Sequence, residues 1–317
     1  MANVFENIRP TIPETDSSGS EQNQYWLSVL IPAYEHPLGV LRILDILQQS
    51  NIGGVECLVS DDSQSIAVEA AIVGHSLYKN GSVSYFRNIP ALGAVINWNS
   101  LIVRSRGEYL LLMHHDECPE RIDFFSVLKQ QLTISVTPDV LLLQCLLPTM
   151  GGYRLRYHVP HWLRRQFMRF GPEHLLRHNT LGSPSVVVVR RRICLPFDET
   201  LKWLVDVEWM VRLLRQPKVR CLYANQLAVV SIPNKATSIT RKLGSEIPRL
   251  RDDEARMICR KLGPMFVFTL LLPSTIPEKL FAGVEFGFWF SLRVMTRGTS
   301  WLFSRPFPVW LRNRVSG

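Results

Sequence analysis

The residues best suited to chemistry follow a short apolar run at residues 109–113. That run has the length and composition of a strand covered on both faces. Four polar residues come directly after it: His114, His115, Asp116 and Glu117. Asp116 and Glu117 offer the hard oxygen ligands that suit Mg²⁺ or Mn²⁺, and His114 can add a nitrogen. The segment therefore predicts either a metal site or a polar turn in which an acidic side chain caps the next helix.

The elements that must position these residues can be read from the hydrophobic pattern. From residue 27 to residue 113, short apolar runs alternate with longer amphipathic segments, which is typical of a mostly parallel, doubly wound α/β sheet. The expected strands are 27–31, 56–60, 83–87 and 109–113, with helices at 38–48, 66–78 and 91–103. Further on we expect strands at 140–146, 185–190, 220–223 and 227–232, a helix at 201–215, and a charged surface helix at 238–262.

Composition limits the class of protein. The chain has 317 residues, of which 46% are hydrophobic, so it can bury the core of one large domain or of one domain with an appendage. A formal charge of +9 favours anionic partners such as nucleotides, phospholipids or nucleic acid. The six cysteines lack close-paired spacing, which predicts reduced core thiols in a cytosolic protein rather than a zinc site or a disulfide framework.

The two ends of the chain differ from the middle. Residues 1–24 are polar and contain no apolar signal segment, so we expect a flexible tail. Beyond Glu285 there is no acidic residue, and five arginines alternate with large aromatic residues. Such a composition suits the headgroup layer of an anionic membrane. A C-terminal helical pair that packs on the domain or on a second subunit is the alternative interpretation.

Two earlier strands also end in functional residue types. The first ends near Pro32, Tyr34 and Glu35, and the second ends in Asp61 and Asp62. Parallel strands bring these ends to the same edge of the sheet as Asp116. An aspartate there can accept the imide hydrogen of uracil or thymine, and Tyr34 can lie flat against a base. The alternative for the aspartate pair is a helix-capping turn.

These blocks, in this order, resemble family 2 glycosyltransferases, which are inverting enzymes of the GT-A nucleotide-diphospho-sugar transferase fold. The resemblance covers about residues 27–214. It rests on the opening strand 28–34, the strand 58–63 with its aspartates, the series Asn88, Gly93, Asn99 and Gly107-Glu108-Tyr109, the segment 114–116, and the later blocks 182–191 and 197–214. His114 stands where the family has the first aspartate of its Asp-x-Asp metal motif.

The resemblance implies roles for particular residues. Asp116 would bind the divalent cation, Mn²⁺ or Mg²⁺, that bridges to the diphosphate. The residues implied in nucleotide-sugar binding are Pro32, Tyr34, Glu35, Asp61, Asp62, Asn88, Gly93, Asn99, His114 and His115. The residues implied on the acceptor side are Ser183, Glu208 and Arg212.

Asp206 matches the family's catalytic base, and its surroundings give a second argument. Its helical neighbours include Trp203, Trp209 and Met210, and a carboxylate among apolar groups has a raised pKa that suits a general base. Glu208 is the alternative, but it stands four residues before Arg212, the spacing of an ordinary structural ion pair.

Together these observations predict three regions: a tail at 1–24, a GT-A domain at 25–235, and a helical, basic and aromatic, membrane-associating region at 236–317. The predicted activity is metal-dependent transfer of a hexose-type sugar from a UDP-, dTDP- or GDP-sugar to a glycan or lipid-linked acceptor in cell-surface polysaccharide synthesis. We expect a cytoplasmic protein, peripheral on the inner face of the membrane, with no nucleic-acid partner. The alternatives are a nucleotidyltransferase and a non-catalytic basic module that binds membrane or nucleic acid.

Overall fold

The structure is a computed structural model that describes residues 25–134, 137–149, 154–169, 171–176, 179–232, 243–262 and 304–306. The predicted tail at 1–24 and most of the predicted membrane-associating region lie outside these residues. Within the described part, no helix is long and apolar enough to cross a bilayer.

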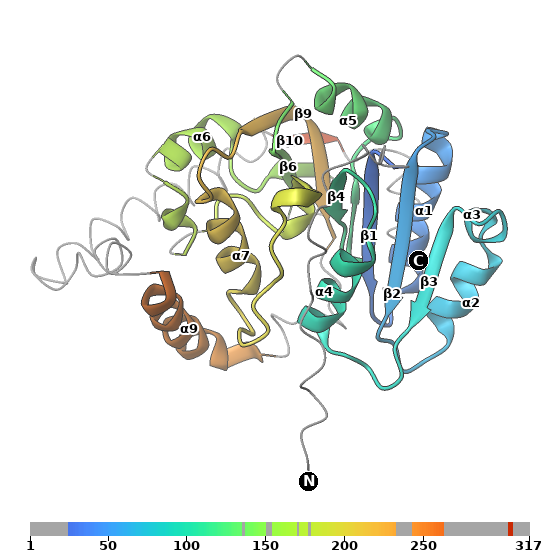
Figure 1. The fold of residues 1–317 in the computed structure, drawn as a ribbon, viewed down its shortest axis with the longest axis horizontal. Helices are drawn as coiled ribbons and strands as arrows, with labels where there is room; N and C mark the ends of the chain where they lie inside the picture. The colour runs from blue at the N-terminus through green and yellow to red at the C-terminus, as the bar shows by residue number, and fades with distance from the viewer. Residues whose placement is uncertain are drawn as a thin grey trace, which may run out of the picture.

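The first half of the chain forms the parallel part of one sheet (Figure 1). Its strands are β1 (Leu27–Ala33), β2 (Val55–Asp61), β3 (Val83–Arg87) and β4 (Tyr109–Leu112), in the spatial order β4-β1-β2-β3. Its helices are α1 (Pro37–Ser50), α2 (Ala67–Gly74), α3 (Ser76–Lys79) and α4 (Ala94–Arg104). The strand order reverses direction after β3, so right-handed connections place α4 on the opposite face of the sheet from α1.

The second half continues the same sheet with mixed directions. Its strands are β5 (Glu117–Pro119), β6 (Val140–Pro148), β7 (Arg154–Tyr157), β8 (Val187–Arg190), β9 (Cys221–Ser231) and β10 (Ser304–Pro306). Strand β8 pairs antiparallel with β4 and with β6, whereas β9 runs parallel to β6 and antiparallel to β5. The helices are α5 (Phe124–Leu132), α6 (His161–Arg169), α7 (Val205–Leu214) and α9 (Ile247–Leu262). The α/β prediction is confirmed, but the sheet is mixed rather than mostly parallel.

The register of the central strands gathers the predicted residues at one edge. Strand β1 is buried along its whole length, as expected for a strand covered on both faces. Ala33 at its end pairs with Asp61 at the end of β2, and Leu30 pairs with Leu112 of β4. The carboxyl ends of β1, β2 and β4 therefore open onto the same space.

Three local expectations need correction. Residues 117–119 form β5, with Glu117 paired to Ser231, and the next helix begins only at Phe124, so the capped-turn interpretation of the acidic segment is wrong. The two strands expected at 220–223 and 227–232 are the single strand β9, whose pairing with β6 shifts register at an irregularity. The helix expected from residue 201 begins at Val205, and the amide groups of residues 202 and 204 before it donate to Glu254.

Candidate active site

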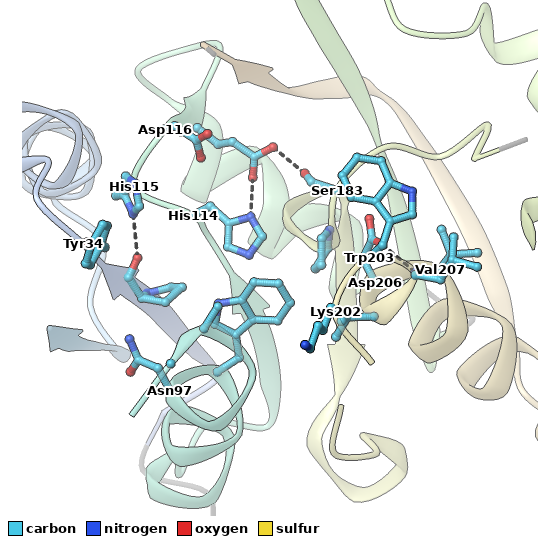
Figure 2. A pocket seen from close by; sticks show the side chains of 18 of the residues that line it. Tyr34, Asn97, His114, His115, Asp116, Ser183, Lys202, Trp203, Asp206 and Val207 are labelled. Carbon is cyan, nitrogen blue, oxygen red and sulfur yellow. Dashed lines mark hydrogen bonds and ion pairs between the residues drawn. The ribbon is translucent and has the colours of Figure 1, made fainter. Parts of the chain in front are cut away.

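A cavity of about 730 Å³ lies at this edge, between the parallel strand ends and the start of α7. Figure 2 shows its two walls: one carries Tyr34, Asn97, His115 and Asp116, and the other carries Ser183, Lys202, Trp203 and Asp206. Residues from both halves of the chain thus face one space. A cavity of this size accommodates a ligand larger than a single sugar.

Asp61 and Asp62 have different environments. Asp61 is fully buried, and its carboxylate accepts hydrogen bonds from the amide and hydroxyl of Ser63 and from the hydroxyl of Tyr85 at 2.7 Å. It does not line the cavity, whereas Asp62 does. Burial, together with the hydrogen bond to Asp61, raises the pKa of the Tyr85 hydroxyl. Asp61 therefore braces β2 against β3, and Asp62 is the aspartate of the pair that a ligand can reach.

Asp62 organises the loop before α4. Its carboxylate accepts hydrogen bonds from Asn88 Nδ2 at 2.8 Å, from the Leu92 amide at 3.1 Å and from the Gly93 amide at 2.8 Å. Gly93 has a φ of +85°, a conformation that glycine adopts without strain. Asn88 does not line the cavity and contacts it through Asp62 and Asn97, while Gly93 lines the cavity itself.

Three other residues predicted to bind the nucleotide sugar also differ in whether they line the cavity. Pro32 and Tyr34 line the cavity. Glu35 instead accepts hydrogen bonds from the amide groups of Gln64 and Ser65, and the hydrogen bond from the Ser65 hydroxyl lowers its pKa. Glu35 thus ties the end of β1 to the loop after β2 and leaves ligand contact to its neighbours.

The polar segment after β4 forms a compact group of possible metal ligands. One atom each from His114, Asp116 and Glu117 lie within 4.8 Å of one another. His114 Nδ1 lies 3.5 Å from Glu117 Oε2, and the His114 amide donates to Ser185 Oγ. His115 lines the cavity beside them, with its Nδ1 3.1 Å from the Pro32 carbonyl oxygen.

The electrostatics of this group favour a cation. Burial raises the pKa of Glu117 to about 8, and the nearby Asp116 carboxylate adds to the shift. Burial lowers the pKa of His114 to about 4. Among the described residues, His114 Nε2 is buried without a partner, and the Asp116 carboxylate accepts no hydrogen bond. Two carboxylates and an imidazole at this spacing fit a divalent cation.

Glu117 is held in place by two hydroxyl groups. Ser183 Oγ donates to its Oε1 at 2.5 Å, and Ser185 Oγ donates to its Oε2. Both serines come from the segment before β8, so Glu117 connects the metal-ligand group to the opposite wall (Figure 2). Ser183 lines the cavity, as its predicted position on the acceptor side requires.

Asp206 lies in the first turn of α7 and faces the cavity beside Trp203 (Figure 2). Its Oδ1 accepts a hydrogen bond from the Val207 amide at 2.8 Å, and Asn179 Nδ2 lies 3.5 Å from its Oδ2. Burial raises the pKa of Asp206 to about 6, the direction expected from its apolar neighbours. A carboxylate with this pKa is ionised at neutral pH and can still accept a proton readily.

Glu208 and Arg212 lie away from the cavity. Arg212 donates from Nε and Nη2 to the two Glu208 oxygens at 2.7 and 2.8 Å, and a further bond reaches the Pro196 carbonyl. Glu208 is buried and neither residue lines the cavity. This pair fastens α7 to the preceding loop, which is the structural interpretation of the four-residue spacing.

An aromatic series joins the two walls, and its first member, Trp98, lines the cavity. The Trp98 ring lies 4.8 Å from the His114 ring and 5.1 Å from the Phe197 ring, which stacks on Trp209 of α7 at 4.7 Å. Asn99 belongs to the same connection, because its side chain exchanges hydrogen bonds with the Phe197 backbone. Asn99 does not line the cavity, so its contact is between protein segments.

The sequence did not point to four residues that shape this site: Asn97, Trp98, Asn179 and Ser185. Asn179 accepts from the amide groups of Leu181 and Gly182 and so fixes the loop beside Asp206. An asparagine three residues before a glycine is a sequence signal for a tight turn, and Gly182 has a φ of +117° in the structure. The other three could be recognised only from their contacts.

Comparison with known proteins agrees with this arrangement. The family model described as "Glycosyl transferase family 2" matches residues 28–193, just over half of the chain. The chain belongs to glycosyltransferase family 2. The match includes both strand-end aspartates and the segment 114–117, and it ends before α7.

Individual relatives are distant. An uncharacterized glycosyltransferase of Haemophilus influenzae is 22% identical over 221 residues, which are 68% of this chain and 71% of that protein. The crystal structure of S. aureus TarS 1-349 has a TM-score of 0.50 and 16% identity, over 81% of this chain and 76% of that one. A longer TarS structure aligns with a TM-score of 0.49 and 14% identity, and this chain spans only 39% of it. The likeness to TarS 1-349 shows a shared fold, which this glycosyltransferase keeps with largely different side chains.

Proposed function

We propose that this glycosyltransferase moves a sugar from a nucleotide-diphospho-sugar to a hydroxyl group of a glycan or lipid-linked acceptor, with inversion at the anomeric carbon. The observation that carries the proposal is Asp206, a carboxylate with a pKa of about 6 that faces Asp116 and its neighbours across one cavity. A base on one wall and a diphosphate site on the other are the two parts that a direct displacement needs.

The donor would bind along the wall built from the strand ends. Tyr34 offers an aromatic face to the base, and Asp62 accepts three hydrogen bonds, so one lone pair remains for an imide hydrogen. Asp62 is favoured over Asp61 because Asp62 lines the cavity. One free lone pair matches the single imide hydrogen of uracil or thymine better than guanine, which offers two adjacent N–H donors to a carboxylate. Asp116 would hold the cation, Mn²⁺ or Mg²⁺, with His114 and Glu117 beside it. When bound, the cation supplies charge neutralisation for the leaving diphosphate.

Asp206 would act on the acceptor. Its carboxylate takes the proton of the acceptor hydroxyl while that oxygen forms a bond to the anomeric carbon. The bond from that carbon to the diphosphate oxygen breaks on the opposite face, and the nucleoside diphosphate leaves. The products are the inverted glycoside and the nucleoside diphosphate, and the proton stays on Asp206 until solvent removes it.

The test is a donor screen on the full chain. We expect calorimetry to show binding of a UDP- or dTDP-sugar, tighter with Mn²⁺ than without it, and we expect Asp206→Asn to keep this binding while transfer falls about 100-fold or more. Asp123→Asn, an exposed aspartate paired with Arg121, is the matched control. Absence of binding by any nucleotide sugar in every metal condition would overturn the proposal.

The family match favours this activity over a nucleotidyltransferase or a non-catalytic basic module. The place in cell-surface polysaccharide synthesis and the peripheral position on the inner membrane face remain proposals. The arginine and aromatic composition after Glu285 supports them. Flotation with anionic and neutral vesicles, with and without residues 264–317, tests the membrane part, since equal binding by both forms would contradict it.

A further inference from the structure

Helix α9 carries a buried carboxylate that the chemistry above does not use. Glu254 is only 3% exposed, although α9 is otherwise rich in exposed charged residues. Its Oε1 accepts a hydrogen bond from the Lys202 amide at 2.6 Å, and its Oε2 accepts from the Leu204 amide at 2.7 Å. The Trp203 amide donates to both oxygens, at 3.2 and 3.0 Å. Three successive backbone amides therefore converge on one side chain.

Those amides belong to the segment that leads into α7. The first amide groups of a helix have no acceptor within the helix, and a capping side chain usually supplies one. Leu204, the residue before α7, cannot do so, and the hydrogen bonds that Asp206 accepts come from Val207 and Asn179. Glu254, on a helix about fifty residues further along the chain, accepts from the Leu204 amide at the start of α7 and from the two amides before it. Hydrogen bonds to a charged acceptor are stronger than those between neutral groups.

The capped segment forms part of the cavity. Lys202, Trp203 and Leu204 line it together with Asp206, and Figure 2 shows Lys202 and Trp203 beside that carboxylate. Arg251, one turn before Glu254, lines the cavity as well. A second contact fastens α9, because Lys261 Nζ donates to Asp198 Oδ2 at 2.5 Å and to Thr200 Oγ1 at 3.2 Å.

We propose that Glu254 is a positioning residue for sugar transfer: it fixes residues 202–204, and through them Asp206, in the orientation that meets the acceptor hydroxyl. This inference rests on the proposed function. Glu254 is the side chain that accepts from the amide groups of all three residues, so its carboxylate determines how this segment is held. These hydrogen bonds do not reach β1, β2 or β4, the strands whose ends form the donor wall of the cavity.

The deciding variant is Glu254→Gln, which keeps the size of the side chain. One of its two oxygen acceptors becomes an NH₂ donor, which must face an N–H donor of the segment. Misplacement of a reacting group by about 1 Å lowers the rate about 100-fold, so we expect kcat to fall between about tenfold and 100-fold. Donor affinity should stay within about twofold, because the opposite wall holds the donor. Glu254→Asp, which keeps the charge with a shorter reach, should give an intermediate rate.

The experiment uses the full chain and the nucleotide sugar that binds in calorimetry. It measures donor Kd, melting temperature, and release of nucleoside diphosphate with water or octyl glucoside as the acceptor. Asp253→Asn, an exposed neighbour on α9 that pairs with Arg256, is the matched control and should match the unmodified chain.

Three results are informative. A fall in kcat with unchanged donor Kd in Glu254→Gln supports the inference. Equal rates in Glu254→Gln and Asp253→Asn overturn it, and so does a loss of donor binding in proportion to the rate. If Glu254→Gln does not fold, the same criteria apply to Glu254→Asp. Failure of the unmodified chain to bind any nucleotide sugar refutes the proposed function itself, which separates the two failures.

Discussion

Replacing Asp206 with asparagine should stabilise the protein at neutral and alkaline pH while it abolishes most transfer. Burial raises the pKa of this carboxyl from 3.8 to about 6, so the folded protein disfavours its ionised form. Asparagine has nearly the same shape, and its oxygen can still accept the hydrogen bond from the Val207 amide. The substitution therefore removes the cost of the buried charge and leaves the local packing in place.

The magnitude follows from the two pKa values. Below about pH 3.8 the carboxyl is neutral in both the folded and the unfolded chain, so it imposes no cost. Between about pH 3.8 and pH 6 the carboxyl ionises in the unfolded chain while it stays protonated in the folded one, so stability is lost over this interval and changes no further above about pH 6. A difference of about two pKa units corresponds to about 2 to 3 kcal/mol. The stability advantage of Asp206→Asn should thus be near zero at pH 4 and about 2 to 3 kcal/mol at pH 8.

Urea denaturation of the full chain at pH 4 and at pH 8 measures this difference, with Asp123→Asn as the exposed control. The comparison depends on the change between the two pH values, so a constant effect of the substitution on packing cancels. If Asp206→Asn destabilises the protein equally at both pH values, the carboxyl does not carry a raised pKa, and the argument for its role as a base loses its electrostatic support.

Three further predictions concern neighbouring groups. The kcat/KM of the unmodified enzyme should fall about tenfold per pH unit below about pH 6 and level off above it, because only ionised Asp206 accepts a proton. A stopped-assay pH profile checks this, and a flat profile between pH 5 and pH 8 would exclude it. Asp116→Asn should weaken Mn²⁺ binding about tenfold or more in calorimetry with the nucleotide sugar present, since even residues that only hydrogen-bond to metal ligands have effects of that size. Unchanged Mn²⁺ affinity would exclude Asp116 as a ligand. Glu208→Gln should cost about 3 kcal/mol of unfolding free energy, because it removes one charge of a pair whose carboxylate is buried, while donor Kd stays the same; a loss of donor binding at unchanged stability would mean that the pair belongs to the site.

The positions of the first four strands and the edge that holds the candidate site could be predicted because both follow from local patterns. Apolar runs gave the positions of β1, β2 and β4, and parallel pairing then required their ends to meet. The ion pair of Glu208 with Arg212 and the raised pKa of Asp206 also depend on neighbours within one helix. Short-range regularities of this kind are visible in a single sequence.

Contacts between distant segments could not be predicted. Nothing near Glu254 in the sequence indicates that its carboxylate accepts from the amide groups of residues 202–204, and α9 has the pattern of an ordinary charged surface helix. The difference between Asp61 and Asp62 has the same origin. It depends on Tyr85 on one side and on Gly93 on the other, and the side-chain directions at a strand end are set by tertiary packing.

Access to the cavity separates the structural carboxylates around the site from those available for chemistry. Glu35, Asp61 and Glu254 each accept at least three hydrogen bonds from protein groups and do not line the cavity, whereas Asp62 accepts three and lines it. Within the described residues Asp116 has no such donor, and Asp206 has one short bond and one at 3.5 Å. Carboxylates that line the cavity and keep free lone pairs can bind a cation or a proton, whereas those outside it fix the backbone segments around the site. The same residue type thus serves both the scaffold and the chemistry, and access to the cavity decides which.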